Sequence, residues 1–214
     1  VLANVYKMTG DIPRAMAQAD RAVKAAPKSA EPRLMLGELY LARRDFPAAL
    51  GAFQDALKVQ PDSAAAKFAI ANLAETQGKR QEAASRYRAI VHQHDNFAPA
   101  LNNLAYLCAE GYGSKEEALR YAFAAYRLEP GNSVVMDTVG YALHRSGRNA
   151  DAVKVLERAA TLAPANPTVR YHLALAYRQS GDLARSQKAL QESLAMGEYP
   201  DKKAAQALLA QLKK

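Results

Sequence analysis

The stretch EPRLMLGELYLARRDFPAALGAFQDALKVQP, residues 31–61, decides the fold. It contains two runs in which apolar residues recur at the spacing of one helix face, on either side of a short polar break. Small and large apolar residues are mixed on the two facing stripes: Leu36, Gly37, Tyr40, Ala49, Phe53 and Ala56. The small residues allow close approach, and the large ones fill the neighbouring gaps. The stretch therefore predicts two antiparallel helices joined by a tight turn.

Two kinds of helix-breaking residue repeat along the chain with one period. Prolines that close helical segments, with Asp95 replacing one of them, are spaced by 34, 34, 35 and 34 residues: Pro27, Pro61, Asp95, Pro130 and Pro164. Glycines that break helices, with Arg44 replacing one, follow the same period: Gly10, Arg44, Gly78, Gly113, Gly147 and Gly181. A single helical hairpin leaves apolar surface exposed on both sides, so it must stack on its neighbours. The period predicts an array of such hairpins.

These residues resemble the tetratricopeptide repeat (TPR), whose pattern of Leu-Gly, Tyr, Ala, Phe, Ala and closing Pro is complete in residues 36–61. The resemblance extends over essentially the whole chain. It implies an all-α fold, a right-handed α-solenoid or TPR superhelix of about six helix-turn-helix repeats and a terminal capping helix. We expect a single array over residues 1–214, divided into a partial repeat 1–29, repeats 30–63, 64–97, 98–132, 133–166 and 167–199, and a capping helix 200–214.

The composition indicates a folded protein. The chain has 214 residues, of which 50% are hydrophobic and 23% charged. No apolar run approaches the roughly 18 residues of a membrane span, so we expect no membrane insertion of this sequence. Because it begins at Val1 and enters a helical pattern at once, we expect a fragment whose own N-terminus, with any targeting signal, is missing. The compartment is therefore unknown from the residues alone.

The formal charge of +8 raises the question of nucleic-acid binding. Residues 1–107 have 14 basic and 10 acidic side chains, and residues 108–214 have 15 and 11, so each half carries +4. Acidic residues, among them Glu31, Glu75 and Asp137, fall on the same predicted surface as the basic ones. A basic stripe matched to phosphates is missing, and we predict no nucleic-acid partner.

Few residues suggest chemistry. His92 and His94 lie two apart, a spacing at which helical side chains do not face each other, so they do not predict a metal site. His144 and His172 fall on the first helices of adjacent repeats, and we expect them to be solvated or in contact with a peptide. Cys108 occupies a slot between the two helices of a repeat, so its thiol should be buried and unreactive. We predict no catalytic residue, cofactor or metal ligand.

In the family that the chain resembles, the first helix of each repeat lines a concave groove that binds ligands. Carried onto this sequence, the candidate partner-binding positions are Leu34, Glu38, Phe68, Asn72, Asn102, Tyr106, Asp137, Tyr141, His144, Arg145, Tyr171 and Arg178. Family members that bind chaperone tails clamp a terminal carboxylate with a Lys and an Asn one turn apart. The pairs Leu34 with Glu38 and Phe68 with Asn72 stand there instead, so we expect no such clamp.

Aromatic side chains next to polar and cationic ones suit a peptide, and they also suit sugar rings. The segments 102–105, 137–140 and 170–174 further resemble the C-terminal repeats of bacterial TPR lipoproteins of exopolysaccharide production and PEP-CTERM sorting, which implies a cell-envelope setting. We predict a non-enzymatic scaffold that binds a peptide or protein partner in its groove, in a bacterial assembly, secretion or envelope system. The alternative is a polysaccharide-binding module of an exopolysaccharide export system.

The segment EGYGSKEEA, residues 110–118, combines a Gly-Tyr-Gly with an acidic pair. Placed on the period, it is the turn inside the fourth repeat, lengthened by one residue, with Gly111 and Gly113 supplying backbone freedom. Ser114 and Glu117 have the S-x-x-E spacing of a capping box that begins the next helix. The segment therefore predicts a turn and no phosphate site.

Overall fold

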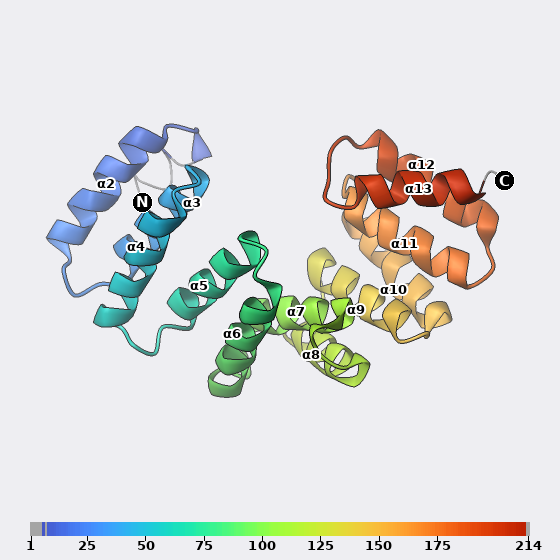
Figure 1. Cartoon of the computed structure of the whole chain (residues 1–214), viewed down its shortest axis with the longest axis horizontal. Helices are drawn as coiled ribbons and strands as arrows, with labels where there is room; N and C mark the ends of the chain where they lie inside the picture. Colours follow the sequence, from blue (N-terminus) through green and yellow to red (C-terminus); the bar gives the residue numbers. More distant parts are fainter. Residues whose placement is uncertain (1–5, 7, 213–214) are drawn as a thin grey trace. The chain divides into compact units, whose positions relative to one another are not determined.

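The structure is a computed structural model that describes residue 6 and residues 8–212 (Figure 1). Its regular elements are helices, and the described residues contain no strand. They are α2 Ile12–Ala25, α3 Glu31–Ala42, α4 Phe46–Val59, α5 Ala64–Thr76, α6 Arg80–Gln93, α7 Ala98–Leu107, the π-helical turn η1 Cys108–Tyr112, α8 Lys115–Leu128, α9 Ser133–Arg145, α10 Asn149–Leu162, α11 Pro167–Gln179, α12 Leu183–Ala195 and α13 Lys202–Leu212. The predicted all-α fold is confirmed. Part of the expected first repeat, residues 1–5 and 7, lies outside this description.

The helices form two compact units, Val1–Asp95 and Asn96–Lys214, which we call unit 1 and unit 2. In unit 1, α3 packs against α2 and α4, and α5 packs against α4 and α6. The core between α3, α4 and α5 contains Ala49, Phe53 and Ile70. Gly37 on α3 faces Phe53 so closely that an added Cβ would stand 2.2 Å from a ring carbon. The pairing of small with large residues that the sequence predicts is therefore present.

Unit 2 repeats this packing. α9 packs against α8 and α10, and it also contacts the first helices on either side, α7 and α11. Gly140 on α9 matches Gly37, with an added Cβ 2.4 Å from the Leu156 side chain on α10. The expected terminal helix is present as α13, which packs on α12 and buries Leu208. No helix in the described part of the chain has both the length and the apolarity of a membrane span.

The turn inside each hairpin uses a left-handed residue, which explains the glycine period. Gly10, Gly78, Gly147 and Gly181 have φ between 76° and 84°. Arg44 has φ of 60° in the equivalent position, the one non-glycine residue with positive φ among the described residues. The next residue, Asp45, caps α4 by accepting a hydrogen bond from the Ala48 amide at 3.2 Å. The cap holds Arg44 in a conformation that L-residues disfavour.

We therefore expect Arg44→Gly to raise the free energy of unfolding by about 1 kcal/mol, because glycine adopts this φ without steric cost. Urea unfolding followed by circular dichroism measures the change. Arg43→Gly is the matched control, since Arg43 has an ordinary φ of −84°, and glycine there adds freedom to the unfolded chain and removes an exposed contact with the Met16 sulfur. An equal or lower stability of the Arg44→Gly variant would contradict this interpretation.

The Gly-Tyr-Gly segment differs in one respect from the expected turn. Its extra residue is accommodated in the π-helical turn η1, which continues directly from α7. Gly111 has φ of 104° and needs glycine for its backbone. Gly113 has extended backbone, so the expected backbone role is wrong there; it is glycine because a Cβ would stand 2.4 Å from the Cys108 sulfur. The predicted capping box of Ser114 and Glu117 is confirmed, and Cys108 is buried as expected.

Candidate functional site

The first helices of unit 2, α7, α9 and α11, contact one another in sequence and present a group of polar and aromatic side chains. We call this group the tyrosine–histidine cluster. Its members are Tyr106 on α7, Glu110 on η1, Asp137, Tyr141 and Arg145 on α9, and His172 on α11. Four of the six are positions that the sequence predicts for partner binding.

Tyr141 is the centre of the tyrosine–histidine cluster. Its ring stacks on Tyr106, with ring centroids 5.4 Å apart and planes at 28°, and on His172, at 4.3 Å and 23°. Both neighbouring first helices therefore contact one residue of α9. Tyr141 is only 7% exposed, so its ring is a packed element of this surface and not an open stacking platform.

The hydroxyl of Tyr141 forms hydrogen bonds with both members of an ion pair. It donates a hydrogen bond to Glu110, and it accepts one from Nη1 of Arg145 at 2.8 Å. The same Arg145 nitrogen lies 3.0 Å from Oε1 of Glu110. Burial raises the pKa of Tyr141, and the hydrogen bond to Glu110 raises it further. The hydroxyl is thus a neutral, fixed donor that bridges two adjacent repeats.

A second ion pair joins α9 to α11. Nδ1 of His172 lies 2.9 Å and 3.0 Å from the two carboxylate oxygens of Asp137. His172 is only 2% exposed. Burial alone would lower the pKa of His172, but the charge and the hydrogen bond of Asp137 outweigh it, so the pKa is raised above its ordinary value. The expectation that His172 is solvated is therefore wrong, because the stacking of α11 on α9 encloses its ring.

This ion pair predicts a pH dependence. Because folding raises the pKa of His172, its contribution to the free energy of unfolding is complete below the pKa of unfolded histidine and is lost as the pH rises through the raised value. Asp137→Asn should weaken that loss and lower the pKa of His172, because burial then opposes only the weaker charges of Asp201 and Glu110. NMR titration of the imidazole protons measures both effects.

His144 provides the control in the same spectra. Its Nδ1 lies 2.8 Å from the side-chain oxygen of Asn149, and burial lowers the pKa of its ring. We expect His144 to titrate below its ordinary value in the wild type and in Asp137→Asn alike. An unchanged pKa of His172 in Asp137→Asn would contradict the assigned ion pair.

Three other predicted positions of unit 2 lie on α7 and α11. Tyr171 is half-buried on α11, with its ring centroid 5.9 Å from that of His172. Arg178 is exposed at the end of α11 and lies 3.3 Å from the Gln211 side chain. Asn102 is half-buried on α7, and its side-chain oxygen has no hydrogen-bond partner among residues 6 and 8–212. These residues give the surface both aromatic and polar groups around a packed centre.

The four predicted positions of unit 1 have different surroundings. Leu34 packs against two core clusters, so it is partly structural. Glu38 is exposed on α3. Asn72 accepts a hydrogen bond from the hydroxyl of Tyr87, whose ring also contacts Phe68 at 5.6 Å between centroids. The structure brings Tyr106, Asp137, Tyr141 and Arg145 together in one network, whereas Leu34, Phe68 and Asn72 in unit 1 mainly support the local packing.

Glu110 and His172 were not predicted as members of the site. A signal was present in the spacing, because Glu110 with Arg145 and Asp137 with His172 are both 35 residues apart. That distance is close to one period, so the two members of each pair belong to adjacent repeats. Opposite charges at this spacing predict contacts between repeats. The described residues contain no group of three or more His, Cys, Asp or Glu side chains arranged to hold a metal ion.

Stacked helical hairpins with small-to-large packing define the chain as a helical-repeat protein. A family model described as tetratricopeptide repeat matches residues 1–63, 34–79 and 68–133, and a second model with the same description matches residues 143–212. The chain belongs to the tetratricopeptide repeat family. The fold of this family is typical of protein–protein interaction scaffolds, which are generally non-enzymatic. No curated protein matches the chain.

Solved structures show the same fold at low sequence identity. YrrB, a TPR protein with an unusual peptide-binding site, is 16% identical with a TM-score of 0.64, over 89% of this chain and 96% of YrrB. TTC0263, a TPR protein of Thermus thermophilus, is 21% identical with a TM-score of 0.64, over 86% of this chain and 98% of that one. A chain of the APC/C hetero-tetramer Cut9–Hcn1 is 16% identical with a TM-score of 0.80, over 98% of this chain and 41% of that one.

Proposed function

We propose that the first helices of unit 2 bind a peptide or an unfolded segment of a partner protein across the tyrosine–histidine cluster. The observation that carries this proposal is the partial exposure of the Glu110–Arg145 pair. Its side chains are 21% and 40% exposed, above a Tyr141 ring that is almost fully buried. A ligand can therefore reach charged groups whose positions are already fixed, which lowers the entropy lost on binding.

The chemistry of this surface favours a polypeptide. A peptide presents amide donors and acceptors together with side chains, and the surface offers a carboxylate, a guanidinium and the half-buried ring of Tyr171. Tyrosine and arginine are also the residues most often found at the energetic centres of interfaces. The peptide-binding site of YrrB and the assembly of Cut9 with Hcn1 support the same type of function for this fold.

Sugar binding is the alternative function, and the experiment below must distinguish it from peptide binding. The Tyr141 ring stacks on Tyr106 and on His172 and is only 7% exposed, so it offers no open face for a sugar to stack on. The likeness of segments 102–105, 137–140 and 170–174 to bacterial envelope lipoproteins supports an envelope or secretion setting for the peptide partner. The envelope or secretion setting is therefore part of the proposed function.

Selection of random peptides displayed on phage against the full chain tests this function. We expect enriched peptides that bind wild type and bind the double variant Tyr171→Ala, Arg178→Ala at least about tenfold more weakly, which corresponds to about 1.4 kcal/mol. Lys154→Ala is the control, because Lys154 is exposed on the second helix α10. Equal losses in variant and control would place the peptide elsewhere and overturn the proposal. So would binding of immobilised acidic polysaccharide that depends on Tyr171 and is not displaced by the peptides.

A further inference from the structure

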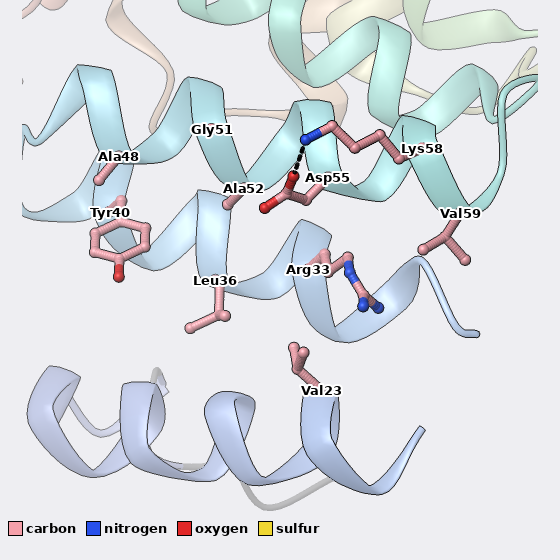
Figure 2. A pocket seen from close by; sticks show the side chains of 10 residues that line it. All are labelled: Val23, Arg33, Leu36, Tyr40, Ala48, Gly51, Ala52, Asp55, Lys58 and Val59. Carbon is pink, nitrogen blue, oxygen red and sulfur yellow. Dashed lines mark hydrogen bonds and ion pairs between the residues drawn. The ribbon is translucent and has the colours of Figure 1, made fainter. Parts of the chain in front are cut away.

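Unit 1 has a groove on a different set of surfaces from the proposed peptide site. It lies between α2 and α4, with α3 as its floor, and has a volume of about 490 Å³ (Figure 2). Figure 2 shows three residues of α3 along this floor, with Arg33 at one end, Leu36 in the middle and Tyr40 at the other end. These residues are three and seven positions apart, so they share one helix face over about 10 Å.

The charge at the Arg33 end is not balanced by the protein. Nη1 of Arg33 donates to the Ser29 carbonyl at 2.7 Å, and no carboxylate of the described chain forms an ion pair with this side chain. The other two charged residues that line the groove, Asp55 and Lys58, pair with each other at 2.8 Å. The lining therefore has a net charge of +1, located at a half-buried guanidinium.

Equivalent positions in other repeats show what usually neutralises such a cation. Lys67, one period after Arg33, lies 2.7 Å from Oε1 of Gln93 and 3.7 Å from Asp62. Arg170, the equivalent residue of the last repeat, pairs with Glu192 at 2.9 Å. Among these three equivalent cations of the described repeats, Arg33 is the one that lacks a carboxylate partner.

The sequence explains why Arg33 differs from Arg170. Asp55 is the period equivalent of Glu192, but it is one methylene shorter and pairs with Lys58, one turn further along α4. The equivalent of Lys58 in the last repeat is Ala195, which cannot compete for Glu192. In this repeat Asp55 is paired with Lys58, and Arg33 has no carboxylate partner among the described residues.

The rest of the groove is apolar and has room for a side chain. Val23 of α2 and Ala52 of α4 form its two walls, on opposite sides of Leu36. Gly51, on the same α4 wall, has open space where a Cβ would stand, with no atom within 4 Å. A large apolar side chain fits over Gly51 and Leu36, and Leu36 lies about one helical turn from Arg33 along α3.

From this geometry we propose that the α2–α4 groove binds an amphipathic helix of a partner protein. The helix places an Asp or Glu on Arg33 and a large apolar side chain, three or four positions away, over Leu36 and Gly51. A helix fits better than an extended peptide, because the walls and floor are themselves helices whose backbone groups are already hydrogen-bonded. An extended ligand would find few free polar side chains here for its amides, because Asp55 and Lys58 pair with each other, whereas a helix satisfies its amides internally.

The test is a selection from a library of alanine-based helical peptides with randomised residues at positions i, i+3, i+4 and i+7, displayed against the full chain. We expect enrichment of an acidic residue with Leu, Phe or Met three or four positions away. Arg33→Glu should weaken binding of the selected helix at least about tenfold, and the same helix with Lys at the acidic position should regain binding to that variant. Arg21→Glu is the matched control, since Arg21 is exposed on α2 outside the groove lining.

Gly51→Leu provides a second, independent variant. It fills the groove with the chain's own side chain and adds a better helix former to α4, so the protein should stay folded with an unchanged or higher melting temperature. We expect it to weaken binding of the selected helix at least about tenfold. Selection without acidic preference, or binding that survives both Arg33→Glu and Gly51→Leu, would overturn the proposal. Failure here leaves the unit 2 site untouched, because the two tests use different peptides and different variants.

Discussion

Gly37→Ala is expected to lower the free energy of unfolding by about 2 kcal/mol or more. The added methyl group would stand 2.2 Å and 2.4 Å from two ring carbons of Phe53, which is itself fully buried in the core between α3 and α4. The ring has no free space to move into, so α3 and α4 must separate. The gain in helix propensity, about 1 kcal/mol, is too small to offset this overlap. Urea unfolding of the variant measures the loss.

Gly51→Ala is the matched control, with the same change in a helix of the same unit. Its new methyl group meets no atom within 4 Å, so only the propensity gain remains. We expect it to raise the free energy of unfolding by about 0.5–1 kcal/mol. If Gly37→Ala and Gly51→Ala change the free energy of unfolding by the same amount in the same direction, the position of Gly37 does not control the packing of the hairpin.

Tyr141→Ala has the second large expected effect, a loss of about 3 kcal/mol or more in the free energy of unfolding. It removes a buried ring that stacks on Tyr106 and His172, and truncation of buried aromatic residues typically costs about 3–5 kcal/mol. It also removes the hydroxyl between Glu110 and Arg145. Guanidinium unfolding followed by tyrosine fluorescence and circular dichroism measures this loss.

Tyr141→Phe separates the two contributions, because it keeps both ring stacks and removes only the hydroxyl. We expect it to cost about 1–2 kcal/mol, the cost of leaving partly buried charged partners without this hydrogen bond. If Tyr141→Ala costs no more than Tyr141→Phe, the ring is not the packing centre of the tyrosine–histidine cluster.

The sequence was sufficient to predict the helical hairpins and most of the residues that end their helices. Helix breakers with a common period marked where each helix ends, since Pro61 and Pro164 each follow the last residue of a helix by two positions. The left-handed Arg44 was marked by its place in a series of glycines. These features are local, so the residues that cause them are also neighbours in sequence.

The site was less predictable because it depends on how repeats stack. Periodicity placed Tyr106 and Tyr141 on adjacent first helices, but it did not reveal that Tyr141 is enclosed. The extra residue of the fourth repeat was expected to lengthen a turn, whereas it forms the π-helical turn η1, which positions Glu110 beside Arg145. Contacts of this kind depend on how far one helix is shifted along its neighbour. The positions of residues within a repeat do not reveal that shift.

The central claim is that the first helices of unit 2 form a peptide-binding surface, and amide chemical-shift mapping of the full chain with a phage-selected peptide tests it most directly. We predict saturable shifts concentrated on α7, η1, α9 and α11, with the largest near Glu110, Arg145 and Tyr171. Saturable shifts concentrated on the second helices α8, α10 and α12 would contradict the claim.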